Sequence, residues 1–136
     1  MSEAVAVIVG ASGGIGGALC KTLNQRACFD QVIELNRQSL NLCDEASIAR
    51  AAKALPARGV QLIVNAVGFL HDDMQFPEKN LGYLNSTSLA YNFAVNAIGP
   101  ALLMKHFFPL LPRDDRAVFA NLSARVGSIE DNRLGG

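Results

Sequence analysis

The sequence predicts an α/β fold in which residues 1–136 form one domain around a doubly wound parallel sheet, in three layers. Three nearly continuous apolar runs support this prediction, at residues 4–9, 60–67 and 117–122. Strands that are buried on both faces of a parallel sheet have this composition. Stretches of helical periodicity lie between the runs, and such alternation favours right-handed crossovers within one sheet.

The first part of the chain is predicted to run strand, helix, strand. The first strand ends at Gly10, and apolar residues then recur at helical spacing through residues 14–27. Residues 31–35 predict the second strand, and residues 39–42 predict a short third one.

The second part of the chain begins with a helix for which Asp44 is a suitable N-cap and which Pro56 closes. After the strand at 60–67, residues 68–85 lack an apolar period and predict a loop. Residues 86–111 predict a long helix, which leads to the last strand.

Composition argues against several classes of protein. Half of the residues are apolar, 18% are charged and the net charge is zero. This balance disfavours disorder, and it gives no basic surface for nucleic acid or an anionic membrane. No membrane-spanning run and no secretory signal are expected. Because Cys20, Cys28 and Cys43 lack CxxC spacing, we expect reduced thiols and a cytoplasmic protein.

The segment VGASGGIGGAL joins the first strand to the first helix. At such a junction a phosphate can meet free helix amides and the positive end of the helix dipole. Gly10 permits the sharp turn, Gly14 permits close approach of a ligand, and Gly16 lets the helix pack tightly on the sheet. A P-loop is not expected, since Cys20 precedes Lys21. The segment therefore predicts a dinucleotide site, and the alternative is a glycine turn that binds nothing.

The end of the second strand is where a dinucleotide fold distinguishes NADP from NAD. The residues there are Asn36 and Arg37. An acidic residue would accept hydrogen bonds from the ribose hydroxyls, whereas the planar guanidinium of Arg37 suits a 2′-phosphate. The sequence therefore favours NADP, and NAD stays open if Arg37 is an ordinary surface arginine.

The long helix contains Pro100, which has no N–H group. The main-chain carbonyl of Asn96, four residues earlier, would lose its helical partner, so we expect a kink and a carbonyl free to hold a water. The alternative is a kinked core helix in which Asn96 caps the distortion. Further along, Leu103 and Phe107 are expected in the core, and His106 at the surface or an interface.

The spacing GxxxGxG resembles that of the short-chain dehydrogenase/reductase family, and the resemblance covers essentially the whole chain. Its other matches are NAVG at 65–68, YNFAVNAIGP at 91–100 and NLSARVGSI at 121–129. Details such as GFLHDD and DNRLGG resemble the C-factor-like subgroup of this family. The resemblance implies a Rossmann-like fold and hydride transfer between NADP or NAD and a small carbonyl or alcohol substrate.

The resemblance also implies roles for single residues. The residues that would hold the cofactor are Gly10, Ser12, Gly14, Ile15, Gly16, Arg37, Asn41, Leu42, Asn65 and Gly68. Asn96 would anchor a relay water, and Ser123 or Ser128 would polarise the substrate oxygen, unless these serines only satisfy loop backbone. The sequence departs from the family pattern at several positions. Val9 replaces the threonine before the first glycine, Ala66 and Val67 alter the middle of NNAG, Asn41 replaces an aspartate that touches the adenine, and Ala124 replaces the second serine of SSxxG.

The family's catalytic YxxxK has no match. Tyr83 and Tyr91 are followed four residues later by Thr87 and Val95. We therefore expect residues 1–136 alone to turn over substrate poorly, and the alternative is a non-catalytic nucleotide-binding or signalling module. The family also implies a homo-oligomer formed through the long helix near Asn96. A metal site at His71, Asp72 and Asp73 is not expected, because these residues lack a distant partner.

Overall fold

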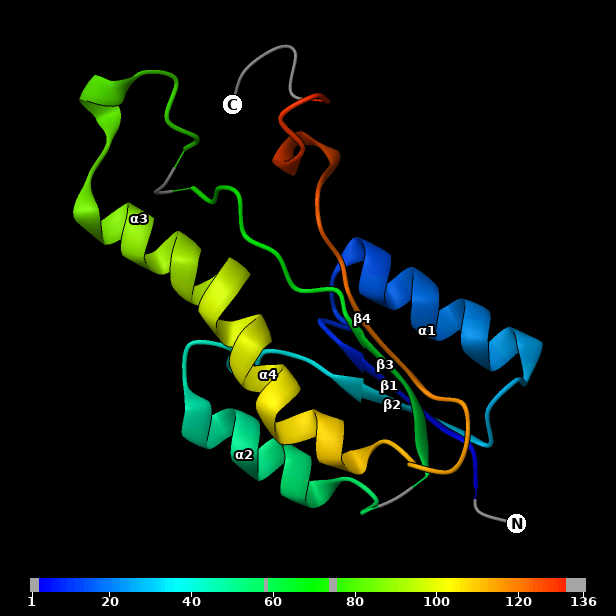
Figure 1. Ribbon diagram of the computed structural model, residues 1–136. Coiled ribbons are helices and arrows are strands. Elements are labelled where there is room, and N and C mark those ends of the chain that lie inside the picture. Colours follow the sequence, from blue (N-terminus) through cyan, green and yellow to red (C-terminus); the bar gives the residue numbers. More distant parts are fainter. Residues whose placement is uncertain (1–2, 58, 74–75, 132–136) are drawn as a thin grey trace.

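The computed structural model describes residues 3–57, 59–73 and 76–131. Within them a parallel sheet has the order β2-β1-β3-β4, and its strands are β1 (Val5–Val9), β2 (Gln31–Leu35), β3 (Val60–Asn65) and β4 (Val118–Asn121). The helix α1 (Gly14–Arg26) covers one face, and α2 (Glu45–Ala54) and α4 (Gly99–Phe107) cover the other (Figure 1). The predicted three-layer α/β fold is confirmed. Residues 132–136, which belong to the segment DNRLGG, lie outside the described residues.

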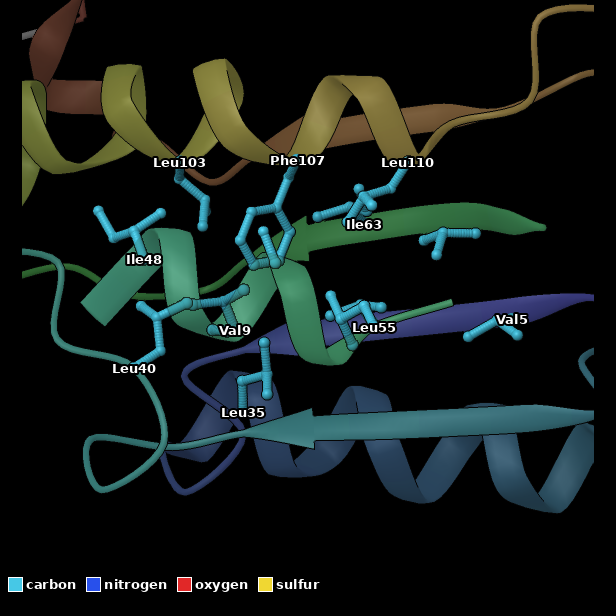
Figure 2. Close-up of a cluster of buried hydrophobic side chains, with 14 of the residues drawn as sticks. Val5, Val9, Leu35, Leu40, Ile48, Leu55, Ile63, Leu103, Phe107 and Leu110 are labelled. Carbon is cyan, nitrogen blue, oxygen red and sulfur yellow. The ribbon is translucent and has the colours of Figure 1, made fainter. Parts of the chain in front are cut away.

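The core forms on both faces of β1, because every residue of this strand is apolar and buried. Val7 pairs with Ile33 of β2 and Ile63 of β3, in parallel register. On the α2 and α4 side, Leu103 and Phe107 reach from α4 toward the sheet (Figure 2), and both are fully buried. The expectation that these two residues are core is confirmed.

The ends of the first two helices follow local capping chemistry. α1 ends at Arg26, and its C-cap Ala27 adopts the left-handed conformation with φ of 48°. Asp44 is the N-cap of α2, as predicted, and the Asp44 side chain accepts a hydrogen bond from the Ala46 amide. α2 stops at Ala54, with Leu55 as C-cap, because the residue before a proline avoids the helical region.

The long helix consists of three parts. Asn85 caps α3 (Ser86–Phe93) by accepting a hydrogen bond from the Ser88 amide, a π-turn spans Ala94–Ile98, and α4 follows. In the π-turn the Gly99 amide donates to the Ala94 carbonyl, five residues back. The distortion expected at Pro100 thus takes the form of a π-turn, which absorbs one extra residue immediately before the proline.

The predicted strand at 39–42 is wrong. The amides of Ser39 and Leu40 both donate to the Asn36 carbonyl, over 3.1 and 2.9 Å. The Asn36 side chain also accepts from the Gln38 amide. These local bonds occupy groups that a strand would use for its ladder, so the segment forms a turn.

The helical stretch Ser86–Leu110 corrects a second expectation. The stretch has 25 residues and contains an 18-residue window with a mean hydropathy of 1.2, so by length and composition alone it could cross a membrane. Core helices of soluble proteins pass the same test, and Leu103 and Phe107 place the α4 part of this stretch against the sheet. The stretch is therefore weak support for a membrane span.

Candidate functional site

A cleft of about 680 Å³ lies at the carboxyl end of the sheet. In the sheet, β2 lies on one side of β1 and β3 lies on the other. The cleft lies at the carboxyl ends of these three strands. Open α/β sheets bind ligands at this point, where the strand order reverses. The lining residues are Val9, Gly10, Ser12, Gly13, Asn36, Arg37, Leu40, Asn41, Leu42, Cys43, Ala66, Val67, Gly68, Phe69, Tyr91 and Val95.

The turn after β1 requires glycine at position 10. Gly10 has φ of 85°, a conformation that L side chains rarely adopt, and its amide donates to the Leu35 carbonyl over 2.8 Å. A Cβ atom here would lie 2.9 Å from Cγ2 of Val67 in the loop after β3. Gly10 therefore lets the ends of β1, β2 and β3 meet closely at the cleft.

The N-terminus of α1 is open to an external acceptor. Its N-cap is Gly13, which has no side chain to accept a hydrogen bond, and its first turn contains no acidic residue. The amides of residues 14–16 have no intrahelical partner, so they can bind an anion. A Cβ atom on Gly14 would meet nothing within 4 Å, whereas one on Gly16 would strike the Gly10 carbonyl. Ile15 is exposed and does not line the cleft.

The turn after β2 presents Arg37 to the cleft. Asn36 holds this turn, because its amide donates to Ser39 Oγ over 2.9 Å and its Oδ1 accepts from the Gln38 amide over 2.9 Å. Arg37 lines the cleft and is exposed. Among the described residues it takes part in no ion pair. The guanidinium is therefore available to an anionic group of a ligand.

The next segment forms the far wall of the cleft. Asn41 and Leu42 both line it, and Leu42 is buried. The Asn41 amide donates to Ser47 Oγ over 3.0 Å, and Asn41 Oδ1 accepts from the Cys43 amide over 2.9 Å. Gly99 allows this wall to approach the long helix, since a Cβ atom there would lie 2.8 Å from Leu42 Cβ.

The loop after β3 separates two residues that the sequence placed together. Gly68 lines the cleft, whereas Asn65 is only 1% exposed and lies behind the lining. Asn65 Oδ1 accepts from the Val67 amide over 3.2 Å. Asn65 therefore supports the backbone of the cleft loop from behind the lining.

The Asn96 side chain binds the backbone of Phe69, which lines the cleft. Its Oδ1 accepts from the Phe69 amide over 2.8 Å, and its Nδ2 donates to the Phe69 carbonyl over 2.6 Å. The side chain thus clamps the cleft wall to the π-turn, and Asn96 is not itself in the lining. The main-chain carbonyl of Asn96 cannot accept a hydrogen bond from residue 100, because Pro100 has no N–H group.

The two candidate serines lie beyond β4, in the orange and red segment of Figure 1. Ser123 and Ser128 are exposed, and neither lines the cleft. The Ser128 amide donates to the Arg125 carbonyl at the end of the 3-10 turn Arg125–Gly127. The structure brings the glycine turn, Arg37, Asn41, Leu42 and Gly68 together, but not the serines.

Sequence reasoning missed several residues of the lining. Phe69 and Tyr91 form one side of the cleft, with ring centroids 4.8 Å apart in an edge-to-face arrangement. Val95, four residues after Tyr91 on the long helix, also lines the cleft. That helical spacing was the available signal, because residues four apart lie on one helix face.

Two ionisable groups outside the cleft have shifted pKa values. Burial, followed by the charge of Glu34, raises the pKa of the Cys20 thiol. Hydrogen bonds from Lys105 and then His106 lower the pKa of Glu45. In the described part of the chain no group of His, Cys, Asp and Glu residues could hold a metal ion.

No model of a protein family matches this chain. It is 31% identical, over 152 residues, to the short-chain dehydrogenase RED3 of Pyricularia oryzae. The match takes in 96% of this chain but only 60% of the length of that relative.

Solved structures of dehydrogenases and reductases have the same fold. A carbonyl reductase from Pseudomonas aeruginosa PAO1 superposes with a TM-score of 0.80 at 20% identity, over 96% of this chain and 66% of that one. A small-chain dehydrogenase in complex with NADPH gives 0.76 at 22% identity, over 92% and 52%. An NADPH-bound carbonyl reductase from chicken fatty liver gives 0.61 at 23% identity, over 96% and 49%. At these identities the likeness shows the fold alone.

Proposed function

We infer that this chain belongs to the short-chain dehydrogenase/reductase family and binds NADP in the cleft at the carboxyl ends of β1, β2 and β3. The observation that carries the proposal is the junction of β1 and α1. There an uncapped helix N-terminus lies behind a glycine turn that lines the cleft. A dinucleotide carries a diphosphate, which is the group that such a helix end binds.

The residues of the cleft fit the parts of NADP in order. The amides of residues 14–16, with Ser12, would hold the diphosphate. Arg37 would bind the 2′-phosphate, since this residue lines the cleft and has no ion-pair partner among the described residues. Asn41 and Leu42 would border the adenine, and Gly68 the middle of the cofactor. The choice of cofactor is supported by a dehydrogenase and a carbonyl reductase of the same fold, both of which hold NADPH in their solved structures.

The proposed reaction is hydride transfer to or from a small carbonyl or alcohol. The bound nicotinamide supplies the redox chemistry, while the protein binds, orients and excludes water. Because both polar atoms of the Asn96 side chain are bound to Phe69, we assign the relay water to the main-chain carbonyl of Asn96. Ser123 or Ser128 would polarise the substrate oxygen, once their segment lies against the cofactor.

We propose that residues 1–136 alone transfer hydride slowly or not at all. They contain no YxxxK, and the chain spans 60% of the length of its curated relative. The second candidate function is therefore a non-catalytic nucleotide-binding or signalling module. NADPH oxidation with simple carbonyls tests the proposed inactivity, since turnover at ordinary enzymatic rates would contradict both it and the non-catalytic module.

Calorimetric titration with NADP and NAD tests the proposed cofactor directly. We expect both nucleotides to bind and NADP to bind more tightly, because only NADP carries the group that Arg37 suits. Tighter binding of NAD would contradict the preference. Absence of binding by either nucleotide at millimolar concentration would contradict the whole proposal.

We also propose that the chain belongs to the C-factor-like subgroup and that it works in the cytoplasm.

We propose further that the chain forms a homo-oligomer through the long helix. α3 has no buried residue, and Phe93 and Ile98 are exposed. Residues 80–104 contain no charged side chain, which is typical of the centre of a subunit interface. Sedimentation velocity tests the oligomer, and Phe93→Glu should shift the distribution toward monomer.

A further inference from the structure

A buried amide connects the cleft to the segment that carries Ser123. Asn65 and Asn121 are register partners at the carboxyl ends of β3 and β4. Asn65 Nδ2 donates to Asn121 Oδ1 over 3.0 Å. Asn65 is 1% exposed, so its polar atoms depend on protein partners.

The hydrogen bonds of Asn65 fix which way its amide faces. Its Oδ1 must accept from the Val67 amide, so its Nδ2 needs an acceptor elsewhere, and Asn121 supplies it. The main-chain carbonyl of Asn65 also accepts from the Leu122 amide over 3.0 Å. Each side of this residue is therefore bound to a different segment, the cleft loop on one side and the end of β4 on the other.

The position of Val67 determines the shape of the cleft. Val67 lines it, and the Val67 side chain packs so closely on the turn after β1 that a Cβ atom on Gly10 would lie 2.9 Å from Val67 Cγ2. The Ala66 amide beside it donates to the Val9 carbonyl over 2.9 Å. A change in the Asn65 amide would therefore move backbone that a nucleotide touches.

We propose that Asn121 is a positioning residue which, through Asn65, sets the Val67–Gly68 backbone and couples nucleotide binding to the segment that begins at Leu122. The inference rests on the proposed NADP site. Ser123 is two residues beyond Asn121, so the same bridge connects the cofactor loop with a candidate substrate-polarising residue. Occupation of the cleft then changes the surroundings of Leu122 and Ser123, which do not line it.

Two substitutions separate positioning from plain stability. Asn121→Leu keeps the size of the side chain but removes the acceptor and excludes water from its place, so the Asn65 amide loses a partner. Asn121→Asp keeps an acceptor at the same position. Phe119→Leu is the control, because it trims the core beneath β4 without touching Asn65.

The experiment is an NADP titration followed by amide NMR signals. In the unmodified chain we expect NADP to shift the signals of Gly14, Gly16, Val67, Leu122 and Ser123. Asn121→Leu should move the Val67 signal even without NADP, abolish the response of Leu122 and Ser123, and weaken NADP binding about tenfold. Asn121→Asp should restore the response and the affinity, and Phe119→Leu should leave both unchanged.

The outcomes separate this inference from the proposed function. If NADP shifts Gly14 and Gly16 but never Leu122 or Ser123 in the unmodified chain, the coupling is wrong and the NADP site stands. If no signal responds, the NADP site itself is wrong and the coupling fails with it. Equal losses of NADP affinity and of the Leu122 and Ser123 response in Asn121→Asp and Asn121→Leu would also overturn the positioning role. The titration of the unmodified chain tests the coupling even if a variant does not fold.

Discussion

At the scale of single residues, Arg37 combines a position in the cleft lining with the absence of any ion-pair partner among the described residues. Arg37→Gln should weaken NADP binding about tenfold to a hundredfold, the range for a lost hydrogen bond to a charged group. NAD binding should change little, since NAD lacks the 2′-phosphate. Calorimetry measures both affinities.

The matched control is Arg50→Gln, because Arg50 lies on α2 and pairs with Asp44 at 3.8 Å, outside the cleft. It should leave both affinities as they are. Equal losses for NADP and NAD in Arg37→Gln would contradict a specific contact with the 2′-phosphate.

The glycines of α1 differ in the space around them, and this gives a second residue-scale prediction. Gly16→Ala should lower the free energy of unfolding by about 1–3 kcal/mol, because its Cβ atom would strike the Gly10 carbonyl. Gly14→Ala should leave stability unchanged or raise it by less than about 1 kcal/mol, because its Cβ atom meets open space. Urea unfolding measures the free energy of unfolding of both variants.

The effect of Gly14→Ala on NADP affinity should not follow its effect on stability. The open space at Gly14 is where a phosphate would approach the helix amides, so Gly14→Ala should weaken NADP binding without loss of stability. If Gly14→Ala binds NADP as the unmodified chain does, the diphosphate lies elsewhere.

At the scale of elements, the cleft wall depends on a clamp between the loop after β3 and the π-turn. Asn96→Ala removes both hydrogen bonds to the Phe69 backbone. We expect the Phe69 amide to exchange its hydrogen at least about tenfold faster, since each lost bond contributes about 1 kcal/mol. Hydrogen exchange followed by NMR measures this.

Asn92→Ala is the matched control, because the Asn92 side chain donates to the Ser88 carbonyl within α3. It removes the same type of side chain from the same helical stretch and should leave the Phe69 amide protected. Equal exchange in both variants would mean that the clamp does not hold the wall.

The contact between α2 and α4 gives a prediction about pH. Glu45 accepts from Lys105 Nζ at 2.7 Å and lies 2.9 Å from His106 Nε2. These bonds lower the pKa of Glu45 in the folded chain. A carboxyl group with a lowered folded pKa stabilises the fold above its unfolded pKa of about 4.3, and this contribution disappears as the pH falls through the folded value.

Glu45→Gln removes this titration. The difference in urea midpoint between the unmodified chain and Glu45→Gln should be largest near neutral pH and shrink toward about pH 3. The comparison cancels the other carboxylates, which titrate in both proteins. A difference that stays constant with pH would contradict the assignment.

At the scale of the whole molecule, the cleft exists only when β1, β2 and β3 end side by side, so NADP should bind the folded chain and not the unfolded one. At about a hundred times the dissociation constant, NADP should raise the free energy of unfolding by about 2.7 kcal/mol. Urea unfolding with and without NADP measures the increase. Arg37→Gln at the same NADP concentration should show a smaller one.

One edge of the described sheet carries exposed apolar residues. β4 is an edge strand, and Val118 and Leu122 are each 43% exposed. Parallel sheets are normally covered on both faces. The described residues therefore leave apolar side chains partly uncovered at this edge of the sheet.

The sequence by itself determined the strands, the two-sided burial of β1 and the glycine turn. Aliphatic runs can be satisfied only in the interior, and Gly10 must be glycine because of its backbone conformation. The interpretation of Asp44 as an N-cap was also reliable, since capping is local. The substrate-side serines and the cofactor remain predictions.

Tertiary structure alone decided the partners of the candidate residues, whereas the turn at 39–42 follows from local hydrogen bonds to Asn36. Asn65, expected at the cofactor, lies behind the lining and pairs with Asn121, and Asn96 is bound to Phe69. The sequence states which residues are polar, but the partner of a polar atom depends on strand register and helix packing. Those are set by residues far apart in the chain, which only the folded core brings together.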